Sequence, residues 1–97
     1  MFNQRVYDLV LRIPVGRVTT YGEIARVLGC KCYRAVGVAL SKNEDSPRVP
    51  CHRVVLSSGG IGGFAFGQNK KVELLVSEGV FVKNGRIVDF ENKFFVF

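Results

Sequence analysis

The chain has 97 residues, of which 47% are hydrophobic and 23% charged, and its formal net charge at neutral pH is +6. This length suits one domain with a single modest core, and this composition excludes a disordered chain. The positive charge favours an acidic partner such as nucleic acid, although charge alone does not establish one.

The first part of the chain predicts two helices. Apolar residues recur with a period near 3.6 over 2–13, which indicates an amphipathic helix that Pro14 ends. Thr20 and Glu23 have the spacing of a capping box, so a second helix is expected over 21–28.

A third helix is expected from Cys32 to Lys42, after Gly29 has ended the second one. Its inward stripe is predicted at Ala35, Val36, Ala39 and Leu40. Two short helices around a glycine-containing turn fit a helix-turn-helix, of which the second is the recognition helix. An αα-corner of a small helical protein explains this spacing equally well.

The middle of the chain predicts loops around a short buried strand. A polar loop is expected over 43–49, and Val54-Val55 is expected as the strand. The glycine-rich segment 57–67 either lets the backbone pass close to a ligand or is a plain flexible loop.

The last part predicts a helix and a hairpin. The helix is expected over 68–77, with Val72, Leu75 and Val76 inward. Asn84-Gly85 lies between two β-rich runs, which is a strong hairpin signal. We expect the apolar tail 94–97 to pack back on the domain or to pair with another chain.

These elements predict a mainly α fold with a small β-hairpin. The arrangement is that of a winged helix-turn-helix domain with three to four helices, forming a single domain over residues 1–97.

Compartment and metal binding are predicted from the cysteines and from the apolar pattern. Three cysteines cannot all pair within one chain, which favours a reducing, cytoplasmic setting. Cys30 and Cys32, even with Cys51 and His52, do not match structural zinc spacings, so no metal is expected. We interpret Cys30 and Cys32 as turn and helix-start residues, with redox pairing as a minor alternative. No run reaches transmembrane length and no signal peptide is evident, so no membrane contact is expected. We also expect a monomer.

The stretch Pro50-Cys51-His52 carries the strongest chemical signal. Pro50 stiffens the backbone before Cys51, and the only histidine of the chain lies beside the thiol. A neighbouring imidazole is a common means of producing the reactive thiolate. An inert buried thiol next to a packed histidine is the simpler alternative.

The run Val49–Val55 resembles the active-site signature of the O6-alkylguanine-DNA alkyltransferases, the methylated-DNA–protein-cysteine methyltransferases. Asn43 stands eight residues before Cys51, as in that family, and the likeness extends from about Phe2 to Gly79. It rests on these positions: Ile13-Pro14, Gly16, Val18, Thr20-Tyr21-Gly22, Ile24-Ala25, Arg34-Ala35-Val36-Gly37, Ala39, Asn43, Gly62, Gly67, Lys71, Leu74-Leu75 and Glu78-Gly79.

The resemblance implies DNA repair by a single-turnover methyltransferase. Cys51 would take the alkyl group from O6-alkylguanine, and from O4-alkylthymine as a second substrate, and would keep it, so no cofactor is needed. His52 would be the base that deprotonates Cys51, and Glu78 would orient His52. Tyr21 would donate a hydrogen bond toward guanine N3, and Asn43 would tie the helix-turn-helix to the Cys51 segment.

The implied partner is double-stranded DNA that contains alkylated bases. Arg34 matches the arginine that enters through the minor groove and replaces a flipped-out nucleotide. Further DNA-contacting positions are expected at Thr20, Tyr33, Ala35 and Gly37. The pocket for the flipped base is expected at Tyr21, Leu40, Val54, Phe64 and Ala65.

The chain departs from the family pattern in several places. The usual N-terminal lobe is expected to be absent, together with any zinc site in it. Phe64 and Ala65 stand where many members have Tyr and Ser, so two hydroxyl donors near O6 are lost. Glu44 and Asp45 add negative charge before Cys51, and Tyr33 is bulky for a groove-facing position.

Other functions remain possible on the sequence. A non-catalytic alkyltransferase-like sensor of alkylated DNA would recruit other repair proteins, but such sensors commonly have tryptophan in place of the cysteine. A helix-turn-helix transcription factor would leave Asn43, Tyr21 and Glu78 without a role. A cysteine hydrolase would need an oxyanion hole and usually a more distant base. Singly, Arg34, Tyr21 and Glu78 also fit ordinary surface or packing roles, and their joint occurrence favours the transferase.

Overall fold

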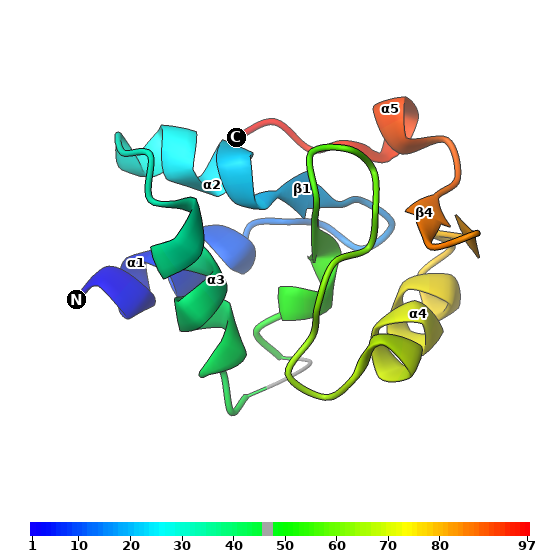
Figure 1. Ribbon diagram of the computed structural model, residues 1–97, viewed down its shortest axis with the longest axis horizontal. Helices are drawn as coiled ribbons and strands as arrows, with labels where there is room; N and C mark the ends of the chain where they lie inside the picture. Colours follow the sequence, from blue (N-terminus) through cyan, green and yellow to red (C-terminus); the bar gives the residue numbers. More distant parts are fainter. Residues whose placement is uncertain (46–47) are drawn as a thin grey trace.

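Five α-helices and two small sheets make up residues 1–45 and 48–97, the part of the chain that the computed structural model describes (Figure 1). The helices are α1 (Phe2–Val10), α2 (Tyr21–Leu28), α3 (Tyr33–Ser41), α4 (Gln68–Ser77) and α5 (Phe90–Lys93), with a 3-10 turn η1 (Cys51–Arg53). The strands are β1 (Thr19–Thr20), β2 (Val54–Val55), β3 (Val82–Lys83) and β4 (Arg86–Ile87). The predicted class, mainly α with a small hairpin, is confirmed. The short helix α5 and the parallel pairing of β1 with β2 were not predicted.

Helix α1 ends earlier than predicted. Its last residue is Val10, and the chain turns through Leu11 before it reaches Pro14. Pro14 therefore follows the helix without ending it. The apolar face is as expected, because Val6 and Val10 are fully buried.

Helix α2 has the predicted bounds, but only half of the predicted capping box forms. The Thr20 hydroxyl accepts a hydrogen bond from the Glu23 N–H at 3.0 Å. The Glu23 carboxylate does not turn back to Thr20. It accepts hydrogen bonds from Arg26, at 2.9 and 2.7 Å, and from the backbone N–H of Phe97 at 3.0 Å. Gly29 ends the helix in the left-handed region at φ 77°, as predicted.

Helix α3 follows after a four-residue connection, 29–32. Cys32 is its N-cap residue, and Val36, Ala39 and Leu40 are buried as predicted. The placement of Ala35 in the inward stripe is wrong, because Ala35 is exposed. Cys30 and Cys32 lie in the turn and at the helix start, as interpreted, and they form a disulfide with their Cα atoms 5.2 Å apart, which was the minor alternative.

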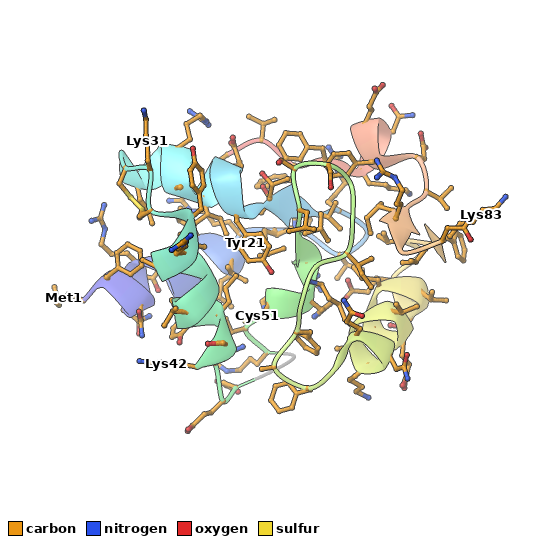
Figure 2. All side chains as sticks on the ribbon, viewed as in Figure 1. Met1, Tyr21, Lys31, Lys42, Cys51 and Lys83 are labelled. Carbon is orange, nitrogen blue, oxygen red and sulfur yellow. A yellow bond between two sulfur atoms is a disulfide. The ribbon has the colours of Figure 1, made fainter. Side chains whose placement is uncertain are left out.

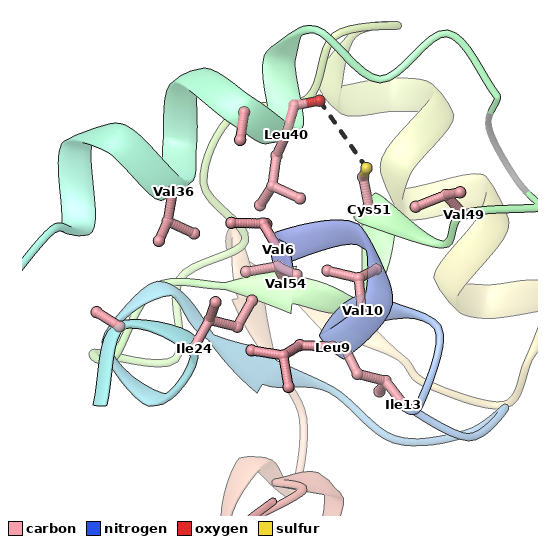
Figure 3. Close-up of a cluster of buried hydrophobic side chains, with 12 residues drawn as sticks. Val6, Leu9, Val10, Ile13, Ile24, Val36, Leu40, Val49, Cys51 and Val54 are labelled. Atoms are coloured by element: carbon pink, nitrogen blue, oxygen red, sulfur yellow. Dashed lines mark hydrogen bonds between the residues drawn. The ribbon is translucent and has the colours of Figure 1, made fainter. Parts of the chain in front are cut away.

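The main core lies between α1, α2, α3 and the segment around Cys51 (Figure 3). Figure 1 shows these three helices on one side of the molecule, and α4, the hairpin and α5 on the other. The buried residues of the main core are Val6, Leu9, Val10, Ile13, Ile24, Ala25, Val36, Ala39, Leu40, Val49, Cys51 and Val54. The segment around Cys51 is thus anchored in the core and is not a peripheral loop. The predicted loop over 43–49 includes residues 46 and 47, which lie outside the described residues.

A second cluster joins the parallel pair to α4 and the hairpin. It contains Val18, Val55, Leu75, Val80 and Ile87, with Val72 partly buried against it. Val76, predicted inward, is 42% exposed, so that prediction is wrong. The hairpin pairs Val82 with Ile87 and Lys83 with Arg86, and both turn residues have positive φ, as a type I′ turn requires.

The C-terminal tail packs back on the domain, the first of the two predicted outcomes. The Phe95 N–H donates to the Val18 carbonyl at 2.7 Å, and the Thr19 hydroxyl donates to the Phe95 carbonyl at 3.0 Å. Within the described residues, no helix is both long and apolar enough to cross a membrane.

Candidate active site and nucleic-acid interface

Cys51 is the first residue of η1, directly after Pro50 and before the buried strand β2. Its side chain is 4% exposed and belongs to the main core. The sulfur lies 3.9 Å from the carbonyl oxygen of Leu40 in α3, along the dashed line in Figure 3. The thiol is thus held between the recognition-helix candidate and the start of β2.

Asn43 connects the end of α3 to this segment. Its side-chain amide donates to the Val49 carbonyl at 3.0 Å and to the Cys51 sulfur at 2.8 Å. Its carbonyl oxygen accepts a hydrogen bond from the Asp45 N–H at 2.9 Å. One buried side chain therefore fixes the loop and orients the sulfur.

The sulfur has a mixed electrostatic environment. Burial raises the pKa of the Cys51 thiol, and the hydrogen bond from Asn43 and the positive charge of Lys71 act in the opposite direction. The net result is a raised pKa, so the resting thiol is protonated and needs a base to react.

His52 follows Cys51 directly in the sequence, and its side chain is fully buried. Its Nε2 lies 3.0 Å from a carboxylate oxygen of Glu78, which assigns the proton to Nε2 in the neutral ring. Nδ1 has no hydrogen-bond partner among the described residues. Burial lowers the pKa of His52 and outweighs the opposing effect of Glu78, so the ring is a neutral base with one free acceptor.

Glu78, just after α4, is held by a second residue, Arg53. The Arg53 guanidinium donates to both carboxylate oxygens, at 2.9 and 2.7 Å, and to the Ile13 carbonyl at 2.7 Å. Burial of Glu78 raises its pKa, but the hydrogen bonds from Arg53 and His52 outweigh this and lower it. Sequence analysis missed Arg53. A signal was present, because an acid after a helix C-terminus is unfavourable without a local cation.

Lys71 is the second residue that sequence analysis left without a role. It is fully buried in α4, and its Nζ donates to the carbonyls of Val54 at 2.7 Å and Gly63 at 2.9 Å. Burial lowers the pKa of Lys71 to about 8. Its position one turn before the buried Leu75 placed it on the inward face of the helix, which was the available signal.

A cavity of about 250 Å³ borders the Cys51 sulfur. It is lined by Tyr21, Gly37, Leu40, Ser41, Cys51, Gly63, Phe64 and Ala65. Four residues predicted for the pocket, Tyr21, Leu40, Phe64 and Ala65, are therefore together. Val54 is fully buried in the core and does not line this cavity, which corrects that part of the pocket prediction.

Tyr21 forms the wall that this cavity shares with a larger one. Burial, and to a smaller extent Cys51, raises the pKa of Tyr21, so its phenol remains a hydrogen-bond donor. A Cβ atom at Gly62, whose φ is 71°, would lie 3.5 Å from the Tyr21 hydroxyl. The glycine-rich segment thus passes close to the phenol, with backbone that favours glycine.

The larger cavity, of about 800 Å³, is open and lies over the start of α3. It is lined by Tyr21, Gly22, Tyr33, Arg34, Gly37, Leu56, Ser57 and Ser58. Three of the residues predicted for DNA contact, Tyr33, Arg34 and Gly37, are here, and Ala35 is exposed beside them. Thr20 is only 5% exposed, and its hydroxyl caps α2. In the described part of the chain, no group of three or more acidic, histidine or cysteine side chains is arranged to hold a metal.

The family model described as the DNA binding domain of 6-O-methylguanine DNA methyltransferase matches residues 1–80. The chain belongs to this family. The predicted resemblance is therefore confirmed.

Members of the 6-O-methylguanine DNA methyltransferase family resemble this chain in both sequence and structure. The methylated-DNA–protein-cysteine methyltransferase of Mycobacterium leprae is 46% identical over 78 residues, which is 79% of this chain and 47% of that protein. The crystal structure of Mycobacterium tuberculosis OGT in complex with DNA is 45% identical, with a TM-score of 0.77, over 79% of this chain and 48% of the other. This likeness confirms the helix-turn-helix prediction for α2 and α3. The chain spans about half or less of the length of its curated relatives.

A third relative is similar to this chain over nearly its whole length. The crystal structure of S. pombe Atl1 in complex with damaged DNA containing O6-carboxymethylguanine has a TM-score of 0.85 at 34% identity. The match covers 97% of this chain and 94% of the other. Structural relatives of this chain are thus known as complexes with DNA, and the DNA in the Atl1 complex is damaged.

Proposed function

We propose that this chain repairs alkylated DNA by transferring the alkyl group from O6 of guanine to the sulfur of Cys51. The observation that carries the proposal is the setting of that sulfur. It borders a cavity of about 250 Å³, and Asn43 donates a hydrogen bond to it. The buried His52–Glu78 pair follows directly along the chain.

Activation of the thiol begins at His52. Glu78 occupies Nε2, which leaves Nδ1 as the ring atom that receives the Cys51 proton, through a water molecule. The imidazolium that forms is stabilised by the Glu78 carboxylate, and Arg53 keeps this carboxylate in place and ionised. Lys71 adds a positive charge that favours the thiolate.

Transfer is a displacement at the alkyl carbon. The thiolate electron pair forms the new S–C bond, the C–O6 bond breaks, and its electron pair passes to the departing guanine. The Tyr21 hydroxyl donates toward guanine N3 and reduces the charge on that base. The alkyl group stays on Cys51, so each molecule reacts once and needs no cofactor.

The guanine must leave the duplex to reach the sulfur. The larger cavity at the start of α3 adjoins the Cys51 cavity through Tyr21 and Gly37, which line both. Arg34 lies at the outer cavity, where its guanidinium can replace the flipped nucleotide in the stack. The partner is thus double-stranded DNA with an alkylated base.

A second candidate function is damage sensing without transfer. It is favoured by the near-complete match to Atl1, a protein whose complex contains O6-carboxymethylguanine. In this function the same cavities would hold the flipped base, and Cys51 would be a wall of the pocket.

Transfer and sensing are distinguished by a duplex that carries O6-methylguanine with a radiolabelled methyl group. Transfer predicts label on the protein, up to one methyl group per molecule, and none on the Cys51→Ser variant. Duplex binding by Cys51→Ser should be nearly intact, because α3 and the basic residues carry the binding. Tight lesion-specific binding with no label on the wild-type protein would establish the sensor and reject the transferase.

A further inference from the structure

A second thiol site lies away from the Cys51 cavity, in the connection between α2 and α3. The Cys30 N–H donates to the Ala25 carbonyl at 3.1 Å and so belongs to the C-terminal cap of α2. The Cys32 carbonyl accepts the first hydrogen bond of α3, from the Val36 N–H at 2.9 Å. Their disulfide joins the end of one helix to the start of the next, with one residue between them. Figure 2 shows it at the edge of the molecule near Lys31, well separated from Cys51.

The surroundings of this pair are those of reactive thiols. Cys30 is exposed and Cys32 is partly exposed, whereas Cys51 is buried. Cys32 stands at the N-terminus of a nine-residue helix that has no side-chain cap and no acidic residue in its first turn. Lys31 lies between the two cysteines. Reactive cysteines in proteins occur at partly exposed helix N-termini beside cations.

We propose that Cys30 and Cys32 are a redox-active pair that is oxidised by a low-molecular-weight disulfide and reduced by a low-molecular-weight thiol. A thiolate of the pair attacks one sulfur of the oxidant, forms a mixed disulfide and releases one thiol. The second cysteine then attacks the protein sulfur of the mixed disulfide, forms the Cys30–Cys32 bond and releases the second thiol. The two electrons and two protons end on the two released thiols.

The redox state of the pair sets the affinity of α3 for DNA, and this consequence rests on the proposed function. Tyr33 and Arg34 are the first two residues after Cys32 and lie at the outer cavity. In the reduced form the start of α3 loses its covalent link to the end of α2. Oxidation forms that link and fixes the helix start that carries Tyr33 and Arg34. Oxidised protein is therefore expected to bind undamaged duplex roughly threefold more tightly, because less of the helix start has to be ordered on binding.

The pair itself is tested by incubating the full chain in glutathione buffers of increasing oxidised fraction. Free thiols are trapped with iodoacetamide and located by peptide mass spectrometry. Cys30 and Cys32 should lose their labels together and form an intramolecular bond, while Cys51 should not pair. Thiols that stay free in oxidised glutathione, or that give stable mixed or intermolecular disulfides, would overturn the proposal.

The consequence is tested by measuring duplex affinity of both forms at one salt concentration. A threefold difference that disappears in the double variant Cys30→Ser, Cys32→Ser supports control of DNA binding by the pair. Equal affinity of oxidised and reduced wild-type protein would reject that control. Failure of both forms to bind duplex at all would reject the proposed function, and the thiol mapping would still decide whether the pair is redox-active.

Discussion

The decisive residue-scale feature of this molecule is the hydrogen-bonded group of His52, Glu78 and Arg53 behind the proposed nucleophile, Cys51. Glu78 contacts both His52 and Arg53, so one carboxylate orients the proposed base and compensates a guanidinium. Its removal should therefore affect both the rate of transfer and the pH dependence of stability.

Glu78→Gln keeps the size of the side chain and removes its charge. Alkyl transfer should slow by about 10²-fold, the lower range of general acid–base catalysis, because the imidazolium loses its partner. Hydrogen bonds lower the pKa of Glu78 in the folded state. Its stabilising effect is therefore complete above the ordinary carboxyl pKa and is lost as the pH falls through the folded value.

Transfer rates and urea unfolding at several pH values measure both effects. The difference in unfolding free energy between wild type and Glu78→Gln should be largest near neutral pH and shrink in acid. The matched control is Glu73→Gln, an exposed acid within α4, which should change neither rate nor stability by a measurable amount. A stability difference that grows in acid would contradict the contacts described for Glu78.

Lys71→Met tests the buried amine. The pKa of Lys71 is about 8 in the folded protein and 10.5 in an ordinary environment. Between these values the unfolded chain binds more protons than the folded one, so this lysine makes stability rise with pH in that window. The free energy of unfolding of wild type minus that of Lys71→Met should therefore increase as the pH rises from about 8 to about 10.5.

Urea unfolding across that range gives the measurement, and Lys70→Met, an exposed neighbour, is the control. The variant is needed for comparison because the raised pKa values of Cys51 and Tyr21 make the stability of the protein fall as the pH rises, opposite to the effect of Lys71. No change in the difference with pH would show that Lys71 titrates normally.

The central element is α3, which lies between the core and both cavities. Gly37, in its middle, lines both cavities and would meet no atom within 4 Å if it carried a Cβ. Its lack of a side chain is therefore unrelated to core packing. It leaves free space where the two cavities adjoin, and we propose that the flipped base passes there.

Gly37→Ala should stabilise the protein by about 0.5–1 kcal/mol, because glycine in a helix interior is unfavourable. It should also slow alkyl transfer by narrowing the passage. Gly29→Ala, the same substitution at φ 77°, should destabilise by about 1–2 kcal/mol. Urea unfolding and transfer rates measure both variants. An unchanged transfer rate in Gly37→Ala would contradict the role given to this glycine.

The element predictions succeeded where local chemistry determines the structure. Thr20, Gly29 and the Asn84-Gly85 turn fix their elements through caps and backbone preferences that a few neighbouring residues carry. Pro14 misled the prediction of α1, because the last residue of that helix is Val10 and the chain turns at Leu11, three residues before the proline. The parallel pairing of β1 with β2 joins residues 35 positions apart, and no local pattern encodes it.

The candidate site was predictable for its motif residues and not for their supports. Arginine and lysine residues such as Arg53 and Lys71 usually lie on the surface, and the hydrogen-bond partners of these two are distant in the sequence. Lys71 is satisfied by two backbone carbonyls, which have no signature in the sequence. Ala35 and Val76 were misplaced because a 3.6-residue period gives the centre of a buried face better than its edges.

For the whole molecule, the decisive property is how its positive charge is distributed. The net charge is +6, and Lys31, Arg34 and Lys42 lie at or near α3. Figure 2 shows Lys31 and Lys83 at opposite sides of the molecule. Because of this separation, replacing Lys31 removes one positive charge near the proposed DNA-binding face, and replacing Lys83 removes one far from it.

Affinity for undamaged duplex should fall steeply with salt, because phosphate contacts release counterions. Lys31→Ala should reduce the slope of log affinity against log salt by about one, and Lys83→Ala should leave it unchanged. Sequence preference should be slight, since the minor groove carries little of the base code. A salt-insensitive or strongly sequence-specific profile would instead favour a transcription factor.

The most direct test of the account is the covalent state of Cys51 after reaction. Wild-type protein is incubated with a duplex that contains one O6-methylguanine, digested, and analysed by peptide mass spectrometry. We predict one methyl group on the Cys51 peptide, no methyl group on the Cys30 and Cys32 peptide, and restored guanine in the DNA. An unmodified Cys51 with the lesion still in the bound duplex would contradict the account.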